Sequence, residues 1–294
     1  MTRARLQLAL AAITSFAALG CGDNILSGAG PADELTTDVG QTLRDEVEAS
    51  LNALTLGSSL DPIGTSPAPP DAASLVAAPC VNPSSPADSD GDGIPDDATY
   101  IFTAPPCRFE GSGGGTLEIV GTLRMRDPAP TGAGFGYDAT LTNLRALFIG
   151  ADGKTIQDVR RNGTRTLSGT VGSLLLTDDL QLLRVFPGHS DAAIDKKWNL
   201  TFTPATPLQI NTPLPSGTLD IAGTMDWSRD NENFSLTITT AAPLQYDASC
   251  TTTGQRIRAG ELHAGGTFGE MPGAVRVTWR ECGSEPRFSF EGSE

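Results

Sequence analysis

The sequence has few of the residues on which most metalloenzymes depend. Among its 294 residues there are two His and three Lys. The scarcity of His argues against most zinc and iron enzymes, because imidazole is the commonest protein ligand for such metals. Basic side chains number 20 and acidic ones 35, which gives a net charge of -15. This balance argues against nucleic acid as a partner, since proteins that bind phosphates need a basic surface.

The sequence also lacks a long apolar run beyond its first twenty residues and lacks a recognisable catalytic motif. The missing run argues against a chain that crosses membranes repeatedly on helices. No nucleophile elbow or phosphate-binding loop occurs, and Gly111–Gly115 precedes an expected strand rather than a helix. His189 and His263 lie at expected surface positions. We therefore expect a protein that is not an enzyme.

Gly (33) and Pro (21) make up about 18% of the chain, against an ordinary usage of about 12% and about 25% or more in disordered chains. The chain is turn-rich without being compositionally disordered. Its length suits one large domain or two small ones.

Residues 1–20 are typical of a signal peptide. Two Arg residues come first, and the apolar run Leu6–Leu19 follows. At 14 residues this run is shorter than the roughly 20 residues that span a bilayer as a helix. The alternatives at its end are cleavage as an ordinary signal peptide and cleavage at Cys21 with attachment of lipid.

The ending Ala18-Leu19-Gly20-Cys21 resembles the lipobox of bacterial lipoproteins, in which the Cys is acylated and becomes the first residue. Ala18 stands where the family usually has Leu, and Leu19 where it usually has a small residue. The resemblance implies a lipid-anchored protein of the cell envelope. Gly22 after the Cys, rather than Asp, implies the outer membrane, facing the periplasm or the surface. Residues 21–32 would form the tether.

The other four Cys residues indicate disulfides in an oxidising compartment. With Cys21 assigned to lipid, an even number remains, and three pairings are possible. Proximity in the sequence favours Cys80–Cys107 and Cys250–Cys282. Free buried thiols and a metal site are the alternatives, and no Cys-x-x-Cys or nearby His supports the metal.

Residues 33–56 are predicted to form one amphipathic helix. Apolar residues recur at steps of three or four, which is the period of one helix face; they are Leu35, Val39, Leu43, Val47, Leu51 and Leu54. Such a stripe ordinarily packs on the helix's own domain, and docking of a partner is the alternative. Residues 57–98, rich in Pro, Ala and Ser at their start, are predicted to be an extended linker.

Residues 99–294 are predicted to form an antiparallel β-domain, because apolar residues alternate with Thr and charged residues. Leu117, Ile119 and Leu123 show this alternation. The fold class is therefore mainly β, an antiparallel barrel or half-barrel with a β-sandwich as the alternative, and one N-terminal helix. Gly121 and Gly223 share the apolar face. Glycine inside a strand permits sharp bending, so a curved sheet is favoured.

A repeated frame indicates an internal duplication of residues 115–186 and 217–290. The segment Gly-Thr-Leu-Glu-Ile-Val-Gly-Thr at 115–122 matches Gly-Thr-Leu-Asp-Ile-Ala-Gly-Thr at 217–224. Convergence of Gly- and Thr-rich strands is the alternative. Five Arg residues also cluster in the sequence, and they form either an anion-binding strip or the solvated side of a sheet; they are Arg124, Arg126, Arg160, Arg161 and Arg165.

Residues 88–97 carry the most specific chemical signal. Asp residues at the first, third, fifth and ninth positions, with Gly93 at the sixth, place oxygen atoms around a hard cation. The expected calcium ligands are Asp88, Asp90, Asp92, the carbonyl of Ile94, Asp96 and, as a substitute for a missing twelfth ligand, Asp97. The alternative is a solvated acidic linker with Asp-Gly turns.

This segment resembles the calcium loop of thrombospondin type-3 repeats, over about ten residues and in one copy. The resemblance implies that Asp88, Asp90, Asp92 and Asp96 bind calcium. It departs at Thr99, where the repeat usually has Asp. Without a bidentate twelfth ligand we expect a dissociation constant of about 10⁻⁴–10⁻³ M.

Three functions remain in competition. The first is an envelope lipoprotein with a calcium-stabilised β-domain and a binding or structural role. The second is a periplasmic carrier of lipid or another apolar ligand, held in a half-barrel. The third is an exported hydrolase. A large apolar cavity would favour the carrier, and a filled core the first function. The protein partner is not indicated.

Overall fold

The computed structural model describes residues 31–54, 80–82, 87–110, 115–186, 188–210, 212–230, 232–250, 256–268 and 271–292. The predicted signal peptide, Cys21 and most of the predicted Pro-rich linker lie outside the described residues. Within them the chain forms one helix, α1 (Pro31–Ala53), followed by twelve strands. The strands are β1 (Val81–Asn82), β2 (Asp97–Glu110), β3 (Thr116–Arg126), β4 (Tyr137–Ile149), β5 (Thr155–Thr170), β6 (Ser173–Arg184), β7 (Ala192–Pro204), β8 (Gly217–Arg229), β9 (Glu232–Tyr246), β10 (Ile257–Phe268), β11 (Met271–Trp279) and β12 (Arg287–Gly292).

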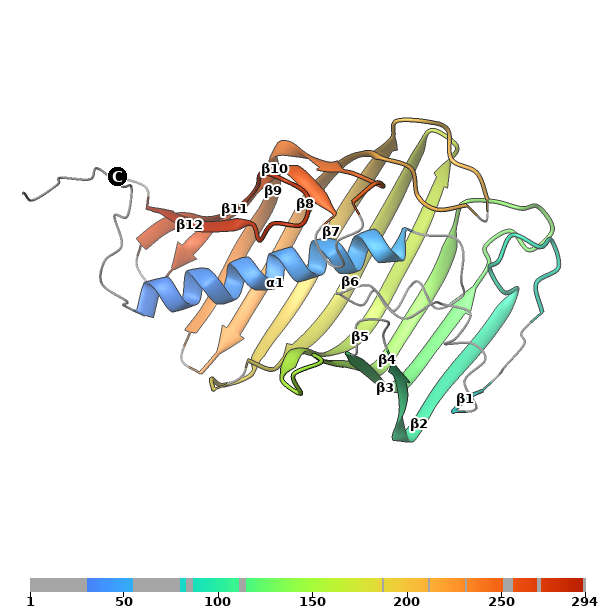
Figure 1. Ribbon diagram of the computed structural model, residues 1–294, viewed down its shortest axis with the longest axis horizontal. Helices are drawn as coiled ribbons and strands as arrows, with labels where there is room; N and C mark the ends of the chain where they lie inside the picture. Colours follow the sequence, from blue (N-terminus) through green and yellow to red (C-terminus); the bar gives the residue numbers. More distant parts are fainter. Residues whose placement is uncertain are drawn as a thin grey trace, which may run out of the picture.

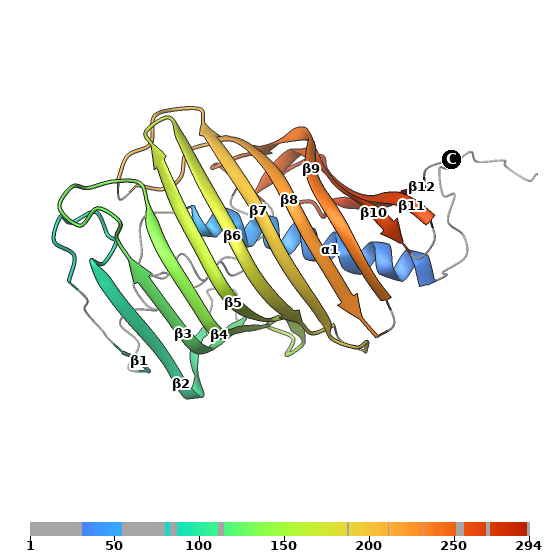
Figure 2. The same ribbon diagram turned by 180° about the vertical axis from the view of Figure 1, so that it is seen from behind.

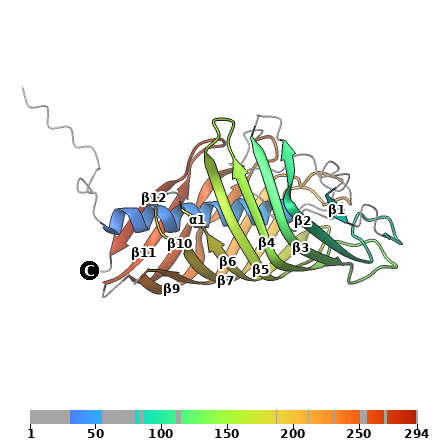
Figure 3. The same ribbon diagram turned by 90° about the horizontal axis from the view of Figure 1, so that it is seen from below.

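All twelve strands belong to one antiparallel sheet, in which each strand pairs with its neighbours along the chain. The sheet is open and strongly curved, and α1 lies along its inner face (Figures 1 and 2). Seen from below, β9 to β12 curl round the helix (Figure 3). The predicted mainly β half-barrel with one N-terminal helix is therefore confirmed. The alternation also holds: Leu117, Ile119 and Leu123 are buried on the inner face.

The predicted helix packs on its own domain. Val39, Leu43, Val47, Leu51 and Leu54 are all fully buried in the core. The helix begins two residues earlier than predicted, at Pro31, and ends three residues earlier than predicted, at Ala53. Where β12 crosses it, a side chain at Gly40 would place its Cβ 2.5 Å from the ring of Phe288. Gly40 thus permits the close contact between helix and strand that closes this end of the half-barrel.

The polar side of α1 is buried as well, because its acidic residues face basic residues of the sheet. A Glu or Asp inside a protein is strongly disfavoured unless a positive charge and hydrogen bonds compensate for lost water. Each of the four acids of α1 whose side chains the structure describes has such a partner. The ion pairs are Asp38–Arg229, Asp45–Arg184, Glu46–Arg161, Glu46–Lys196 and Glu48–Arg256. Helix and sheet are therefore complementary in charge as well as in apolar surface.

A second buried cluster lies within the sheet and adjoins the first. The carboxylate of Asp178 on β6 accepts two hydrogen bonds from Arg165, at 2.6 and 2.8 Å. It also accepts the indole N–H of Trp198 at 3.1 Å and pairs with the ammonium of Lys196 at 2.8 Å. Since Lys196 also donates to Glu46 at 2.7 Å, the cluster continues directly into the helix.

The two glycines that were predicted to allow curvature, Gly121 and Gly223, have different structural roles. Gly121 has a φ of 123° and lies where the pairing of β3 with β4 shifts register. Gly223 pairs with Trp198, and a Cβ there would lie 2.6 Å from the Trp198 side chain and 2.2 Å from the carbonyl oxygen of Lys197. Gly223 therefore permits β8 to lie close to the backbone of β7 at Trp198.

The repeated frame occupies β3 in the first half and β8 in the second. The triplet Tyr-Asp-Ala also occurs twice, at 137–139 and 246–248, but the two copies do not lie at matching places. Tyr137 begins β4, whereas Tyr246 ends β9. The internal duplication stays a prediction.

The two disulfides form as sequence proximity predicted. Cys80 is joined to Cys107 and Cys250 to Cys282, with Cα atoms 5.5 and 5.9 Å apart. The first bond joins the residue before β1 to the last part of β2, three residues before that strand ends. Among the described residues, no helix has both the length and the apolar character needed to cross a membrane.

Candidate functional site

The acidic loop before β2 is folded around its own carboxylates. Asp88 accepts hydrogen bonds from the backbone N–H groups of Gly91 and Gly93, at 2.8 and 3.0 Å. Asp90 accepts from the N–H of Asp92 at 3.2 Å. Gly91 and Gly93 have φ values of 77° and 92°, a region that side chains disfavour. The Asp and Gly positions of the motif thus make one tight turn.

Three of the predicted ligands come together in this turn. Asp88, Asp90 and Asp92 each offer a carboxylate oxygen, and these oxygens lie within 4.8 Å of one another. Such a group of oxygens is the donor set that calcium prefers. The Ile94 side chain is buried in the core, and its N–H donates to Asp92 at 2.9 Å.

The other two predicted ligands are engaged elsewhere. Asp96 accepts two hydrogen bonds from Ser89, from its N–H at 2.9 Å and its hydroxyl at 2.6 Å, and these bonds lower the pKa of Asp96. Asp97 begins β2, where both its oxygens accept from Arg124 at 2.9 and 2.6 Å. The geometry therefore does not group Asp96 or Asp97 with the other three.

A fourth carboxylate, that of Asp127, lies next to the acidic loop. Asp127 follows β3 and is outside the motif, so the spacing of the motif could not predict it. Because Asp97 pairs with Arg126 across the β2–β3 hairpin, the next residue lies against the loop. The N–H of Asp127 donates to the carbonyls of Pro95 and Asp96, at 3.0 and 3.3 Å. Only the register of the hairpin brings this residue to the acidic loop.

Asp92 and Asp127 both have a raised pKa. Burial is the main cause for each carboxyl group. The charges of Asp90, Asp96 and Asp88 raise the pKa of Asp127 further. Asp92 is held in place by the N–H of Gly134, which donates to it at 3.1 Å from the segment between β3 and β4. A cation bound among these acids would relieve their mutual repulsion.

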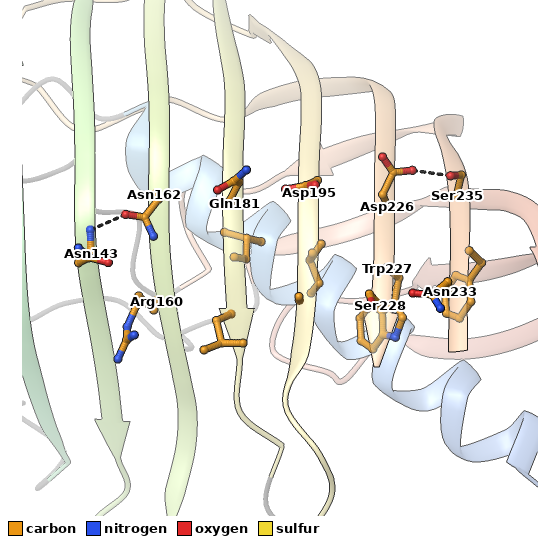
Figure 4. Close-up of a pocket in the computed structure, with 15 residues that line it drawn as sticks. Asn143, Arg160, Asn162, Gln181, Asp195, Asp226, Trp227, Ser228, Asn233 and Ser235 are labelled. Carbon is orange, nitrogen blue, oxygen red and sulfur yellow. Dashed lines mark hydrogen bonds between the residues drawn. The ribbon is translucent and has the colours of Figure 1, made fainter. Parts of the chain in front are cut away.

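A second candidate site is a hollow of about 630 Å³ on the outer face of the sheet, over β4 to β9. Figure 4 shows a row of polar side chains crossing it, one from each strand, with α1 on the far side. The strand register aligns Asn162, Gln181, Asp195, Asp226 and Ser235 in this row. Amide, carboxylate and hydroxyl groups on neighbouring strands suit a polar, hydroxyl-rich ligand better than an apolar one.

The five Arg residues that cluster in the sequence share neither an anion-binding strip nor one solvated side of the sheet. Arg161 and Arg165 are buried on the inner face, where they pair with Glu46 and Asp178. Arg160 points the opposite way and lines the outer hollow. Side chains alternate between the faces of a strand, so neighbouring Arg residues cannot share one surface.

No family model matches the chain, and no match was found among curated proteins or among solved structures. No enzyme family was therefore found.

Proposed function

We propose that this protein is a lipoprotein of the cell envelope whose β-domain has a binding or structural role. The observation that carries this proposal is the position of α1, whose apolar and acidic sides both pack against the inner face of the half-barrel. A filled inner face favours this role over that of a carrier. The outer face, with its polar hollow, is the surface at which we expect binding.

The lipobox-like ending at Cys21 supports the anchor. Acyl chains hold a protein on a membrane by burying methylene groups, and two or more chains give a stable attachment. The two disulfides among the other four Cys residues leave Cys21 as the odd one. They also fit an oxidising compartment outside the cytoplasm.

Replacement of Cys21 with Ser is expected to abolish acylation and release the protein from the membrane fraction. Gly22→Ala, which keeps the acceptor thiol, is the control and should stay attached. Intact-mass spectrometry of the two purified proteins checks this: only the control should carry acyl mass. An unacylated wild-type N-terminus would contradict the anchor.

The carrier of an apolar ligand is the competing function, and it requires α1 to leave the inner face. That movement would strand several buried charges on both helix and sheet, at a cost of several kcal/mol for each charge. Native mass spectra of the same preparations distinguish the two. A lipid bound in one-to-one ratio would favour the carrier.

We also propose that the acidic loop binds calcium and stabilises the start of the β-domain. The loop lies between β1, which the Cys80–Cys107 disulfide holds, and β2. Ion and disulfide would then fix the same segment. The support is the group of three carboxylate oxygens at Asp88, Asp90 and Asp92.

Calorimetric titration of the wild type with calcium is expected to give a dissociation constant of about 10⁻³ M or tighter. Asp90→Ala removes one of the three clustered carboxylates and should abolish the heat of binding. Asp220→Ala, at an exposed position on β8, is the control and should bind as the wild type does. Equal titrations of wild type and Asp90→Ala would refute calcium binding at this loop.

A further inference from the structure

One oxygen of Asp127 is buried and lacks a hydrogen-bond partner. The residue is only 5% exposed. Its Oδ1 accepts from the N–H of Ala129 at 2.7 Å, but its Oδ2 has no partner. A buried carboxylate oxygen without a partner is costly, and in native proteins such an oxygen points to an ion or water that satisfies it.

The unsatisfied oxygen of Asp127 has a counterpart in the acidic loop. Asp90 Oδ2 is likewise buried and without a hydrogen-bond partner. The backbone hydrogen bonds of Asp127 to Pro95 and Asp96 attach this residue to the same loop. Two buried carboxylate oxygens thus lack a hydrogen-bond partner, one in the loop and one on the residue attached to it, and a cation near both would satisfy them.

The backbone fixes Asp127 in this position independently of its side chain. Its N–H is shared between the carbonyls of Pro95 and Asp96, so the end of β3 is attached to the end of the loop. A short distance along the chain, Gly134 donates to Asp92. The segment 127–134 thus contacts the loop at two points.

We propose that Asp127 is a ligand of the same calcium ion as Asp88, Asp90 and Asp92, supplied from outside the loop. This inference rests on the proposed calcium site. Asp127 takes the place of the ligand that the loop itself lacks at Thr99. Four carboxylates favour calcium over magnesium, because calcium accepts six to eight oxygen ligands in flexible geometry whereas magnesium demands a near-ideal octahedron.

A ligand from outside the loop gives the ion a second structural effect. A loop with all its ligands internal would order only residues 88–96 on binding. With Asp127 as a ligand, the ion also fixes the connection between β3 and β4. Calcium would then join three parts of the chain: the segment before β2, the end of β3 and the residues around Gly134.

Calorimetry with calcium chloride on full-length Asp127→Asn tests the inference. Asn keeps the size of the side chain and the acceptor for Ala129 but removes the charge. We expect the dissociation constant to rise by about tenfold or more, because ligand charge sets calcium affinity. Asp97→Asn is the matched control: the residue was a predicted ligand but pairs with Arg124, and its affinity should stay within about twofold of the wild type.

The outcomes separate the inference from the proposed function. If Asp90→Ala and the wild type both fail to bind, the calcium site itself is refuted. If Asp90→Ala loses binding while Asp127→Asn keeps the wild-type affinity, calcium stands and the role of Asp127 is overturned.

Hydrogen exchange on the wild type gives a second test that needs no variant. We expect calcium to increase amide protection both in residues 88–96 and in residues 127–134. Protection confined to residues 88–96 would overturn the inference, even if Asp127→Asn failed to fold. Magnesium at the same concentration is the control and should change neither segment.

Discussion

Replacement of Asp178 with Asn is expected to lower the free energy of unfolding by about 3–5 kcal/mol, the range for breaking a buried ion pair on one side. Asp178 is fully buried, and its carboxylate faces both Arg165 and Lys196. Burial alone would raise its pKa, but these two cations outweigh burial and hold the pKa of Asp178 far below its usual range. Asn is nearly the same size, so the loss would come from the charge rather than from a cavity.

Urea unfolding of the disulfide-bonded protein measures this effect, with Asp179→Asn as the control. Asp179 is the next residue on β6, but its side chain points outward and is 61% exposed near Lys197. Surface ion pairs contribute little, so we expect a change of at most about 0.5 kcal/mol there. Similar losses in the two variants would contradict the role of Asp178 as the counter-charge of the sheet interior.

The double variant Asp178→Leu with Arg165→Met shows whether the loss in Asp178→Asn comes from the missing ion pair or from leaving Arg165 buried without a counter-charge. Removing both members of a buried pair often costs less than removing one, because no isolated charge stays behind. Lys196 would keep Glu46 as its partner. We therefore expect the double variant to be more stable than Asp178→Asn, and a lower stability would show that packing dominates at this cluster.

The strands could be predicted from the sequence because burial on one face of a sheet imposes a period of two. The inward residues of β3 and the apolar stripe of α1 follow their periods, and both lie in the core. A curved sheet was also predicted from glycines on the apolar face, and Gly121 lies where the pairing of β3 with β4 shifts register. Local pattern thus predicted the elements and the presence of a bend.

The buried charges were harder to predict, because a charged residue normally marks the solvated face. Lys196 shares the parity of Ile194 and Trp198, and Asp178 that of Leu176 and Leu180. The strand pattern therefore contained the signal. The pairing of Lys196 with Glu46, 150 residues apart, could not be found without the docking of the helix, which no local pattern specifies.

The residues of the candidate calcium site were likewise predictable where they depend on local structure and not predictable where they depend on contacts between distant parts of the chain. The spacing of the motif predicted the three clustered carboxylates, since a tight Asp-Gly turn is a local structure. It also predicted Asp96 and Asp97, whose oxygens the structure places on Ser89 and Arg124. Asp127 was missed because it reaches the loop only through the pairing of β2 with β3, a contact between distant parts of the chain.

The buried carboxylate of Glu46 is expected to make the domain sensitive to acid. Burial would raise its pKa, but Arg161 and Lys196 outweigh burial and lower the pKa of Glu46 from 4.5 to about 2. The unfolded chain therefore binds the proton more readily than the folded protein between these values. The stabilisation is complete above about pH 5 and is lost as the pH falls toward 2, by about 3 kcal/mol in total.

The variant Glu46→Gln isolates this contribution from the other acids. At pH 6 it should be less stable than the wild type, because Arg161 and Lys196 lose their shared counter-charge. The difference between the two proteins should shrink steadily as the pH falls from 5 to 2.5, since the wild type then also becomes neutral at this position. Urea unfolding at a series of pH values measures the difference directly.

Two further residues decide how this result is interpreted. Glu48, two positions along α1, has a raised pKa because burial outweighs Arg256, so its proton uptake opposes that of Glu46 in the wild type and the variant alike. The difference between these two proteins cancels this opposing effect. Glu110→Gln makes the same chemical change on a side chain that is 70% exposed, and its difference from the wild type should stay near zero throughout. A Glu46→Gln difference that stayed constant from pH 6 to pH 2.5 would mean that the charge of Glu46 does not hold the helix in the half-barrel.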